Sequence, residues 1–174
     1  MLLLENKDFR EFVELLNSNA VKFLVVGGHA VGFHGHPRFT GDLDIWIATD
    51  PDNAARVARL LEEFGFGSLK LETRDFTRPG YAIQLGRPPY RIDILTSIDG
   101  VDFPAAYRRR VTIRSGKLTI PFIALGDLLA NKRAAARAQD LADVENLVRV
   151  ARRSSQSRRS LSRARTAGKS RKEK

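Results

Sequence analysis

Residues 41–45 read Gly-Asp-Leu-Asp-Ile and constrain the fold more than any other segment of the chain. Side chains two positions apart in a β-strand point to the same side of the sheet, so Asp42 and Asp44 share one face. The apolar residues between and after them share the other face, as in a half-buried strand. Two adjacent carboxylates repel each other unless a cation lies between them. The segment therefore predicts a strand over residues 42–48 with a cation site on its polar face.

A third acid occurs in a second predicted strand, residues 90–96, where Asp93 lies between two isoleucines. If the two strands are neighbours, Asp93 joins Asp42 and Asp44 at one site. The chain has no cysteine, so any metal would be bound by carboxylate, histidine or backbone atoms, and these acids favour a hard ion such as Mg²⁺. Such a site could lower the pKa of an attacking hydroxyl group and neutralise charge on a transferring phosphoryl group.

A glycine pair follows the first internal apolar run. Residues 22–26 predict a buried strand that ends in a tight turn at Gly27 and Gly28, and residues 29–35 predict a short helix. Glycine lets the backbone come close to a bulky anion, and the N–H groups at the start of a helix favour negative charge. We therefore expect a triphosphate at Gly27 and Gly28, with His29 as a candidate phosphate contact.

Hydrophobic periodicity and turn residues predict the other elements. The expected helices cover residues 8–17, 50–65 and 125–150, the last with a break near Ala138. The expected strands cover residues 81–85, 111–114 and 117–120. This order predicts an α/β (α+β) fold in which a small mixed sheet has flanking helices and a C-terminal helical segment.

Positive charge is concentrated at the end of the chain. The formal net charge is +10, and residues 152–174 contain ten Lys or Arg and one Glu, so residues 1–151 are nearly neutral. The end segment has little apolar surface to bury, which predicts a disordered basic tail after a single domain at 1–151, whose C-terminal helical part is 125–151. The tail would attract RNA phosphates or only improve solubility. No signal peptide or membrane-spanning stretch is evident, so the expected location is the cytoplasm, without a membrane partner.

Three motifs occur in a characteristic order: Val26-Gly27-Gly28, then residues 38–45 (Arg-Phe-Thr-Gly-Asp-Leu-Asp-Ile), then Asp93. Over residues 20–150 they resemble the nucleotidyltransferase fold superfamily, and Arg-x-Thr-x-Asp-x-Asp is similar to its small bacterial and archaeal branch related to AbiEii abortive-infection toxins. The resemblance implies a minimal nucleotidyltransferase fold. It also implies Mg²⁺-dependent transfer of a nucleoside monophosphate from a nucleoside triphosphate to a hydroxyl of tRNA or of a protein, and a cognate antitoxin as a further partner.

Arg38 and Thr40, just before the Asp-x-Asp strand, are candidate nucleotide-binding residues. A guanidinium group matches the oxygens of a phosphate, although Arg38 could instead form a surface salt bridge with a neighbouring acid. Thr40 is expected to orient the loop before Asp42.

In the AbiEii-like branch, a lysine and an aspartate on a C-terminal helix complete the site. The resemblance therefore assigns Lys132 to triphosphate contact and Asp140 to orienting Lys132 or the acceptor, with Arg137 and Asp143 as alternatives. On one continuous helix, Lys132 and Asp143 would share nearly the same face, whereas Lys132 and Asp140 would differ by about 80°.

Two other functions compete with nucleotidyl transfer. One is a non-catalytic protein of the same fold that binds RNA or a partner through the tail and residues 108–110, which are all arginine. The other is a kinase-like transfer of a phosphoryl group. The products distinguish the two enzymes, because nucleotidyl transfer releases pyrophosphate and a kinase releases a nucleoside diphosphate.

Overall fold

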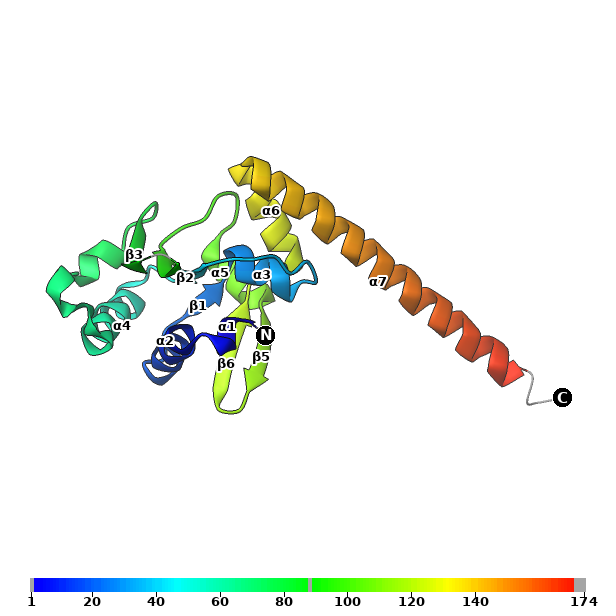
Figure 1. Cartoon of the computed structure of the whole chain (residues 1–174), viewed down its shortest axis with the longest axis horizontal. Helices are drawn as coiled ribbons and strands as arrows, with labels where there is room; N and C mark the ends of the chain where they lie inside the picture. The colour runs from blue at the N-terminus through cyan, green and yellow to red at the C-terminus, as the bar shows by residue number, and fades with distance from the viewer. Residues whose placement is uncertain (1, 88, 171–174) are drawn as a thin grey trace.

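A mixed sheet forms the centre of the computed structural model, which describes residues 2–87 and 89–170 (Figure 1). Its six strands lie in the order β3-β4-β2-β1-β6-β5. Their bounds are β1 (Phe23–Val25), β2 (Asp42–Ile47), β3 (Ala82–Arg87), β4 (Tyr90–Leu95), β5 (Val111–Ser115) and β6 (Leu118–Phe122). The pairs β2–β4 and β1–β6 are parallel, and β1–β2, β3–β4 and β5–β6 are antiparallel. The predicted α/β fold with a mixed sheet is thus confirmed.

Helices flank this sheet and continue into a long C-terminal helix. The α-helices are α1 (Leu2–Glu5), α2 (Lys7–Ser18), α3 (Gly27–Phe33), α4 (Pro51–Leu61), α5 (Phe103–Arg109), α6 (Leu125–Ala135) and α7 (Ala138–Ser170). Three shorter helical segments follow α4: η1 (Glu62–Phe66), η2 (Gly67–Leu69) and η3 (Thr73–Phe76). The predicted start at Asp50-Pro51 is confirmed, since the Asp50 side chain accepts a hydrogen bond from the Asn53 N–H and caps α4.

The core lies on the apolar face of β2. Leu43, Ile45 and Ile47 are fully buried there, together with the apolar residues of α2 and α4. The opposite face carries Asp42 and Asp44 near the start of the strand. Further along that face, Trp46 is also buried, and its ring makes an edge-to-face contact with Phe103 of α5 at 5.0 Å between ring centroids. Trp46 therefore packs inside the protein, and only the first part of the strand's polar face is open.

Several element boundaries differ from the prediction. Helix α3 begins at Gly27 rather than His29, and Gly86 and Arg87, predicted in a turn, belong to β3. The first helix after β6 ends at Ala135, and the next residue, Ala136, has a left-handed φ of 51°, which confirms a break close to the predicted position. The predicted helix over residues 50–65 is divided into α4 and η1. Helices α1 and α5 and the segments η2 and η3 were not predicted, because each is too short for a clear hydrophobic period.

Helix α7 extends away from the rest of the molecule as one long helix (Figure 1). It continues through position 151, where the sequence placed the end of the ordered domain, and reaches Ser170. Residues 171–174 lie outside the described residues, and the disorder of the tail stays a prediction. Among the described residues, no helix combines the length and apolar character needed to cross a membrane.

Asn53 holds the β1–β2 pair at the end opposite to Asp42. Its side chain is fully buried, accepts a hydrogen bond from the Lys22 N–H at 2.7 Å and donates to the carbonyl groups of Lys22 and Ala48 at 3.1 and 2.9 Å. These bonds tie the start of β1 to the end of β2, and so help to fix the register that decides which face carries the acids.

We predict that Asn53→Ala lowers the free energy of unfolding by about 3 kcal/mol, because it removes the three hydrogen bonds between the Asn53 side chain and the backbone of Lys22 and Ala48. Urea denaturation followed by circular dichroism measures the change. Asp52→Asn, at the exposed neighbouring position, is the control and should stay within about 0.5 kcal/mol of the wild type. Equal stability of the two variants would contradict the role given to Asn53.

Candidate active site

Parallel pairing of β2 and β4 brings the three predicted acids together. The register places Asp44 opposite Asp93 and Asp42 opposite Arg91. All four side chains belong to the face opposite the apolar core, since residues directly paired across two strands share a face. The prediction of one site for the three acids depended on these two strands being neighbours, and the structure confirms that they are.

Arg91 binds two of the acids directly. Its Nε donates to Asp93 Oδ1 at 2.7 Å, and its Nη2 donates to Asp93 Oδ2 at 3.0 Å and to Asp42 Oδ2 at 2.8 Å. The hydrogen bond to Asp93 raises the pKa of Arg91 above its ordinary value. In the part of the chain that the structure describes, no group of three His, Cys, Asp or Glu side chains is arranged to hold a metal ion. Sequence reasoning missed Arg91, although its position two residues before Asp93 places both on one strand face.

Asp44 is the acid with the strongest electrostatic perturbation. Its pKa is raised to about 6, mainly by burial and also by the negative charges of Asp93 and Asp42, which together outweigh the hydrogen bond from the Gly28 backbone and the positive charge of Lys132. The folded protein therefore disfavours the charged form of this carboxyl group.

The glycine pair lies against the acid site. Gly27 has a φ of 58°, and a Cβ at this position would overlap the carboxylate of Asp44. A Cβ at Gly28 would lie 2.7 Å from Thr40 Oγ1, which itself donates a hydrogen bond to the Asp42 carbonyl at 3.2 Å. Both glycines are thus needed for close packing, and Thr40 orients the chain before Asp42. Phosphate binding at Gly27, Gly28 and Thr40 stays a prediction.

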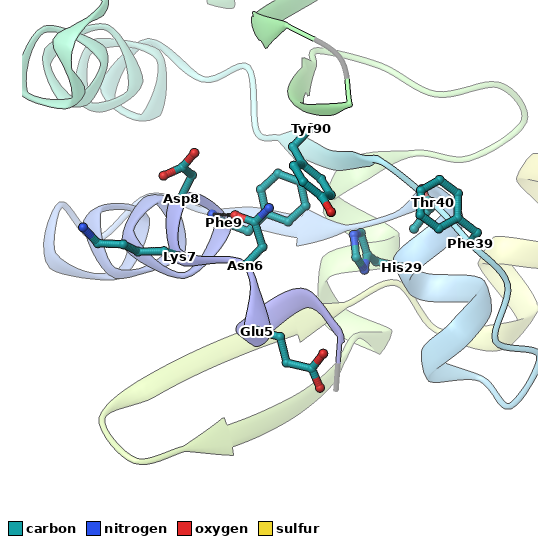
Figure 2. Close-up of a pocket in the computed structure, with 9 residues that line it drawn as sticks. All are labelled: Glu5, Asn6, Lys7, Asp8, Phe9, His29, Phe39, Thr40 and Tyr90. Carbon is teal, nitrogen blue, oxygen red and sulfur yellow. Dashed lines mark hydrogen bonds between the residues drawn. The ribbon is translucent and has the colours of Figure 1, made fainter.

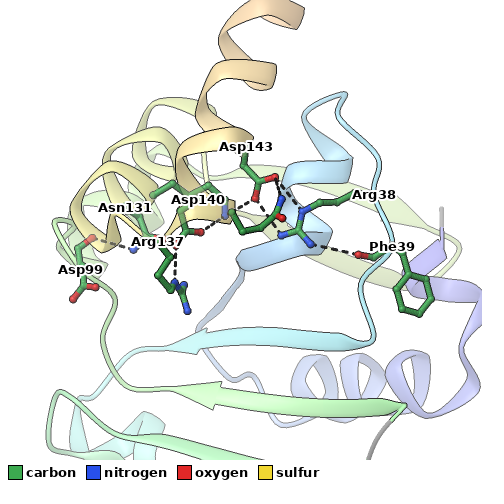
Figure 3. Close-up of polar contacts among 9 residues, drawn as sticks. Arg38, Phe39, Asp99, Asn131, Arg137, Asp140 and Asp143 are labelled. Carbon is green, nitrogen blue, oxygen red and sulfur yellow. Dashed lines mark hydrogen bonds and ion pairs between the residues drawn. The ribbon is translucent and has the colours of Figure 1, made fainter.

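A buried ionic network joins α6 to α7. Lys132, whose side chain is 4% exposed, donates to Asp140 Oδ1 at 2.7 Å and lies 2.9 Å from Asp143 Oδ2. Arg137 contributes a further contact, from Nε to Asp140 Oδ2 at 2.6 Å (Figure 3). Burial alone would raise the pKa of both aspartates, but hydrogen bonds from their cationic partners outweigh it and hold each pKa below its ordinary value.

This network corrects the helical geometry expected from the sequence. The expectation that Asp143 and not Asp140 shares a face with Lys132 assumed one continuous helix. The left-handed residue Ala136 instead separates two helices, and the turn between them brings both aspartates to Lys132. Asp140 contacts Lys132 as the resemblance implied, whereas the contact of Lys132 with a triphosphate stays a prediction.

Arg38 forms an ion pair across the molecule. Its Nε and Nη2 donate to the two carboxylate oxygens of Asp143 at 3.0 and 3.1 Å (Figure 3). Arg38 thus forms a salt bridge, but its partner is a buried aspartate 105 residues away on α7 and not a neighbouring acid on the surface. This ion pair connects the loop that contains Phe39 and Thr40 to the buried network of Lys132, because Asp143 contacts both Arg38 and Lys132.

His29 lies beside an aromatic pocket of about 390 Å³. The rings of Phe9 and Tyr90 contribute to its lining, with Phe39 and Thr40 across from them (Figure 2). Burial lowers the pKa of His29 to about 4, so its ring is neutral at pH 7. No hydrogen-bond partner of its buried Nε2 is present among the described residues. A neutral imidazole attracts phosphate weakly, and the phosphate contact proposed for His29 stays a prediction.

The raised pKa of Asp44 makes the stability of the metal-free protein depend on pH. Because the pKa in the folded state, about 6, exceeds the ordinary value of 3.8, the stabilising contribution of the protonated carboxyl is complete below the ordinary value and is lost as pH rises through 6. We predict that Asp44→Asn raises the free energy of unfolding in EDTA at pH 7.5 by up to about 3 kcal/mol, since each pKa unit corresponds to about 1.4 kcal/mol.

Urea denaturation of both proteins at pH 7.5 and pH 4 tests this prediction, and the difference should nearly vanish at pH 4. Asp52→Asn removes the same charge from an exposed position and serves as the control. A loss of stability in Asp44→Asn at pH 7.5 would contradict the electrostatic cause.

The Lys132 network predicts a large effect on stability. Replacing Lys132 by Met removes the cation that Asp140 and Asp143 share, although each aspartate keeps one arginine partner. The lost charge-assisted hydrogen bonds should lower the free energy of unfolding by about 2–3 kcal/mol. Chemical denaturation measures the loss. Arg133→Met removes a positive charge at the adjacent exposed position and should change stability by less than about 0.5 kcal/mol. Similar effects of the two variants would show that the buried network contributes little.

Comparison with known proteins gives the chain a family. No curated protein matches its sequence. Among solved structures, a candidate nucleotidyltransferase of Thermotoga maritima is 16% identical, with 80% of this chain and 88% of that chain covered and a TM-score of 0.48. An antigenic nucleotidyltransferase-like protein of Paracoccidioides brasiliensis is 18% identical, with 80% and 72% covered and a TM-score of 0.46. Neither likeness is close enough to assign a role to a residue. Residues 5–169 match the family described as nucleotidyl transferase of unknown function (DUF2204), and the chain belongs to this family.

Proposed function

We propose that the protein is a Mg²⁺-dependent nucleotidyltransferase that moves a nucleoside monophosphate from a nucleoside triphosphate to a hydroxyl acceptor. The observation that carries this proposal is the convergence of Asp42, Asp44 and Asp93 on one face of the sheet, with Gly27 packed against Asp44. The description of the family to which the chain belongs, nucleotidyl transferase of unknown function, supports the general class of reaction.

The three acids suit Mg²⁺ by their chemistry. Mg²⁺ is bound by oxygen ligands and commonly keeps positions for the phosphates of a substrate. The raised pKa of Asp44, caused by burial and by the charges of Asp93 and Asp42, is evidence of repulsion that a cation would relieve. When bound, Mg²⁺ would neutralise charge on the phosphates and polarise the phosphoryl group that is transferred.

In the proposed reaction, the acceptor oxygen forms a bond to the α-phosphorus. The bond between this phosphorus and the oxygen that bridges to the β-phosphate breaks, and pyrophosphate leaves. Asp42 and Asp44 would hold the metal, and Asp93 would complete the metal site and help to remove the proton of the acceptor hydroxyl. Gly27 and Gly28 are proposed to bind the phosphates through the backbone at the start of α3, next to Asp44 and Thr40, which pack closely against the two glycines.

Two cationic residues, Lys132 of α6 and Arg38 of the loop before β2, would complete the site. The positive charge of Lys132 acts on Asp44 and lowers its pKa, so Lys132 is near enough to influence bound phosphates electrostatically. Asp140 holds the Lys132 ammonium group at 2.7 Å, as expected of a residue that orients it. Arg38, fixed by Asp143, is proposed to contact the nucleotide from the loop before β2.

The acceptor that we favour is a hydroxyl of tRNA or of a protein, in an AbiEii-like toxin that a cognate antitoxin controls. This part of the proposal depends on the Arg-x-Thr-x-Asp-x-Asp pattern that ends at Asp44. The Lys and Arg residues after position 151 would attract an RNA acceptor electrostatically. Label recovered in the RNA or in the protein fraction would distinguish the two acceptors.

A second candidate is a non-catalytic protein that binds RNA or a partner on the same fold. The observation in its favour is the position of Arg91, whose guanidinium group is hydrogen-bonded to both Asp42 and Asp93. A melting temperature that rises when Mg²⁺ and ATP are added would favour the enzyme, because a ligand stabilises the state that binds it.

We predict that the purified protein transfers label from α-³²P nucleoside triphosphates to total cellular RNA or protein in the presence of Mg²⁺. Asp42→Asn should reduce the rate by about 10³-fold or more, since a metal ion supplies several kcal/mol of charge stabilisation. Removal of Mg²⁺ by EDTA should have the same effect, and pyrophosphate should be released in proportion to the label.

Asp52→Asn is the matched control and should transfer label at the wild-type rate, because Asp52 is exposed on α4. Label that appears only from γ-³²P nucleotides would indicate a kinase instead. Label that Asp42→Asn does not reduce, or no label at all with either nucleotide, would contradict the proposed function.

A further inference from the structure

Arg91 occupies the place between two of the proposed metal ligands. Its planar fork bonds both oxygens of Asp93, at 2.7 and 3.0 Å, and the same Nη2 atom reaches Asp42 Oδ2 at 2.8 Å. Both oxygens of Asp93 and one oxygen of Asp42 therefore already have a cationic partner. Bidentate contact of this kind is the strongest that a guanidinium group makes with a carboxylate.

A divalent cation needs the same oxygens. Mg²⁺ prefers oxygen ligands, and it would draw on the carboxylate oxygens that now accept hydrogen bonds from Arg91. Arg91 and the metal ion would therefore compete for Asp93, and their like charges would repel each other. Each would neutralise the repulsion that closely placed carboxylates create on this sheet face.

The guanidinium group of Arg91 can also leave the site toward solvent. Arg91 lies at the second position of β4, and its side chain is 26% exposed. Its long flexible stem can turn toward solvent without moving the strand. Phosphate oxygens would offer the displaced guanidinium group another bidentate partner.

We propose that Arg91 is an internal counter-cation that competes with the divalent metal for Asp42 and Asp93, and that a bound triphosphate draws it away. Metal binding without nucleotide is then weakened by the hydrogen bonds of Arg91 that must break. Metal and nucleotide would bind cooperatively, because each favours the same displaced position of Arg91. This inference depends on the proposed function, since it assigns the metal to the same acids.

The test measures Mn²⁺ binding to the 174-residue chain by the electron paramagnetic resonance signal of free Mn²⁺, with and without a non-hydrolysable nucleoside triphosphate. Arg91→Gln should bind Mn²⁺ without nucleotide about 10-fold more tightly or better, within the usual range of coupling between two sites. The nucleotide should tighten Mn²⁺ binding less in this variant than in the wild type.

Three further variants make the measurement specific. Arg91→Lys keeps the charge but cannot form the fork, so its affinity should lie between those of wild type and Arg91→Gln. Arg87→Gln removes a positive charge from an exposed position of the neighbouring strand β3 and should bind Mn²⁺ like the wild type. Asp44→Asn should abolish the tight binding, which locates the ion at the acids.

The outcomes separate the inference from the proposed function. Unchanged or weaker Mn²⁺ binding by Arg91→Gln, with binding still lost in Asp44→Asn, would overturn the role of Arg91 and leave the metal site intact. Absence of Mn²⁺ binding in every protein, with or without nucleotide, would overturn both. If Arg91→Gln does not fold, the Mn²⁺ affinity of Arg91→Lys tests the inference instead. An Mn²⁺ affinity of Arg91→Lys equal to that of the wild type would then overturn the inference.

Discussion

Parallel pairing of β2 with β4 is the constraint on which the site depends. It sets Asp44 beside Asp93 and Asp42 beside Arg91 in one register, while the same register buries Leu43 and Ile45 on the other face. A slip of one residue in either strand would turn its acids into the core. The hydrophobic effect on one face thus holds together charges on the other that would separate if they were free.

Two cations from different elements oppose the charge of these acids. Arg91 lies in the sheet and contacts Asp42 and Asp93 directly. Lys132 acts on Asp44 from α6 and is itself held by α7. Gly27 completes the arrangement, because the absence of a side chain there lets the Asp44 carboxylate pack against the backbone. The acid site therefore depends on several distant elements of the fold, although the Asp-x-Asp motif that first indicated it lies within residues 41–45.

Local sequence patterns predicted what depends on local geometry. The alternation around Asp42 and Asp44 defined a strand and its two faces, and the Asp50-Pro51 pair located the start of α4. Which strands are neighbours depends on long-range packing, so the contact between β2 and β4 could only be assumed. The path after α6 depends on one left-handed alanine, Ala136, and alanine gives no signal for that conformation because it favours ordinary helix. Arg91 could have been found, since a strand places residues 91 and 93 on one face.

The two cations near the acids differ in how firmly they are held, and this difference separates their roles. Lys132 is 4% exposed and lies between two buried aspartates, so moving it would leave both without their shared cation. Arg91 is 26% exposed, and the carboxylates it would leave are those that a metal ion would neutralise. Removal of Lys132 therefore has a large energetic cost, whereas exchange of Arg91 for another cation keeps the charge balanced. Of the two, Arg91 is the residue suited to respond to ligands, and Lys132 is suited to provide a fixed positive charge beside Asp44.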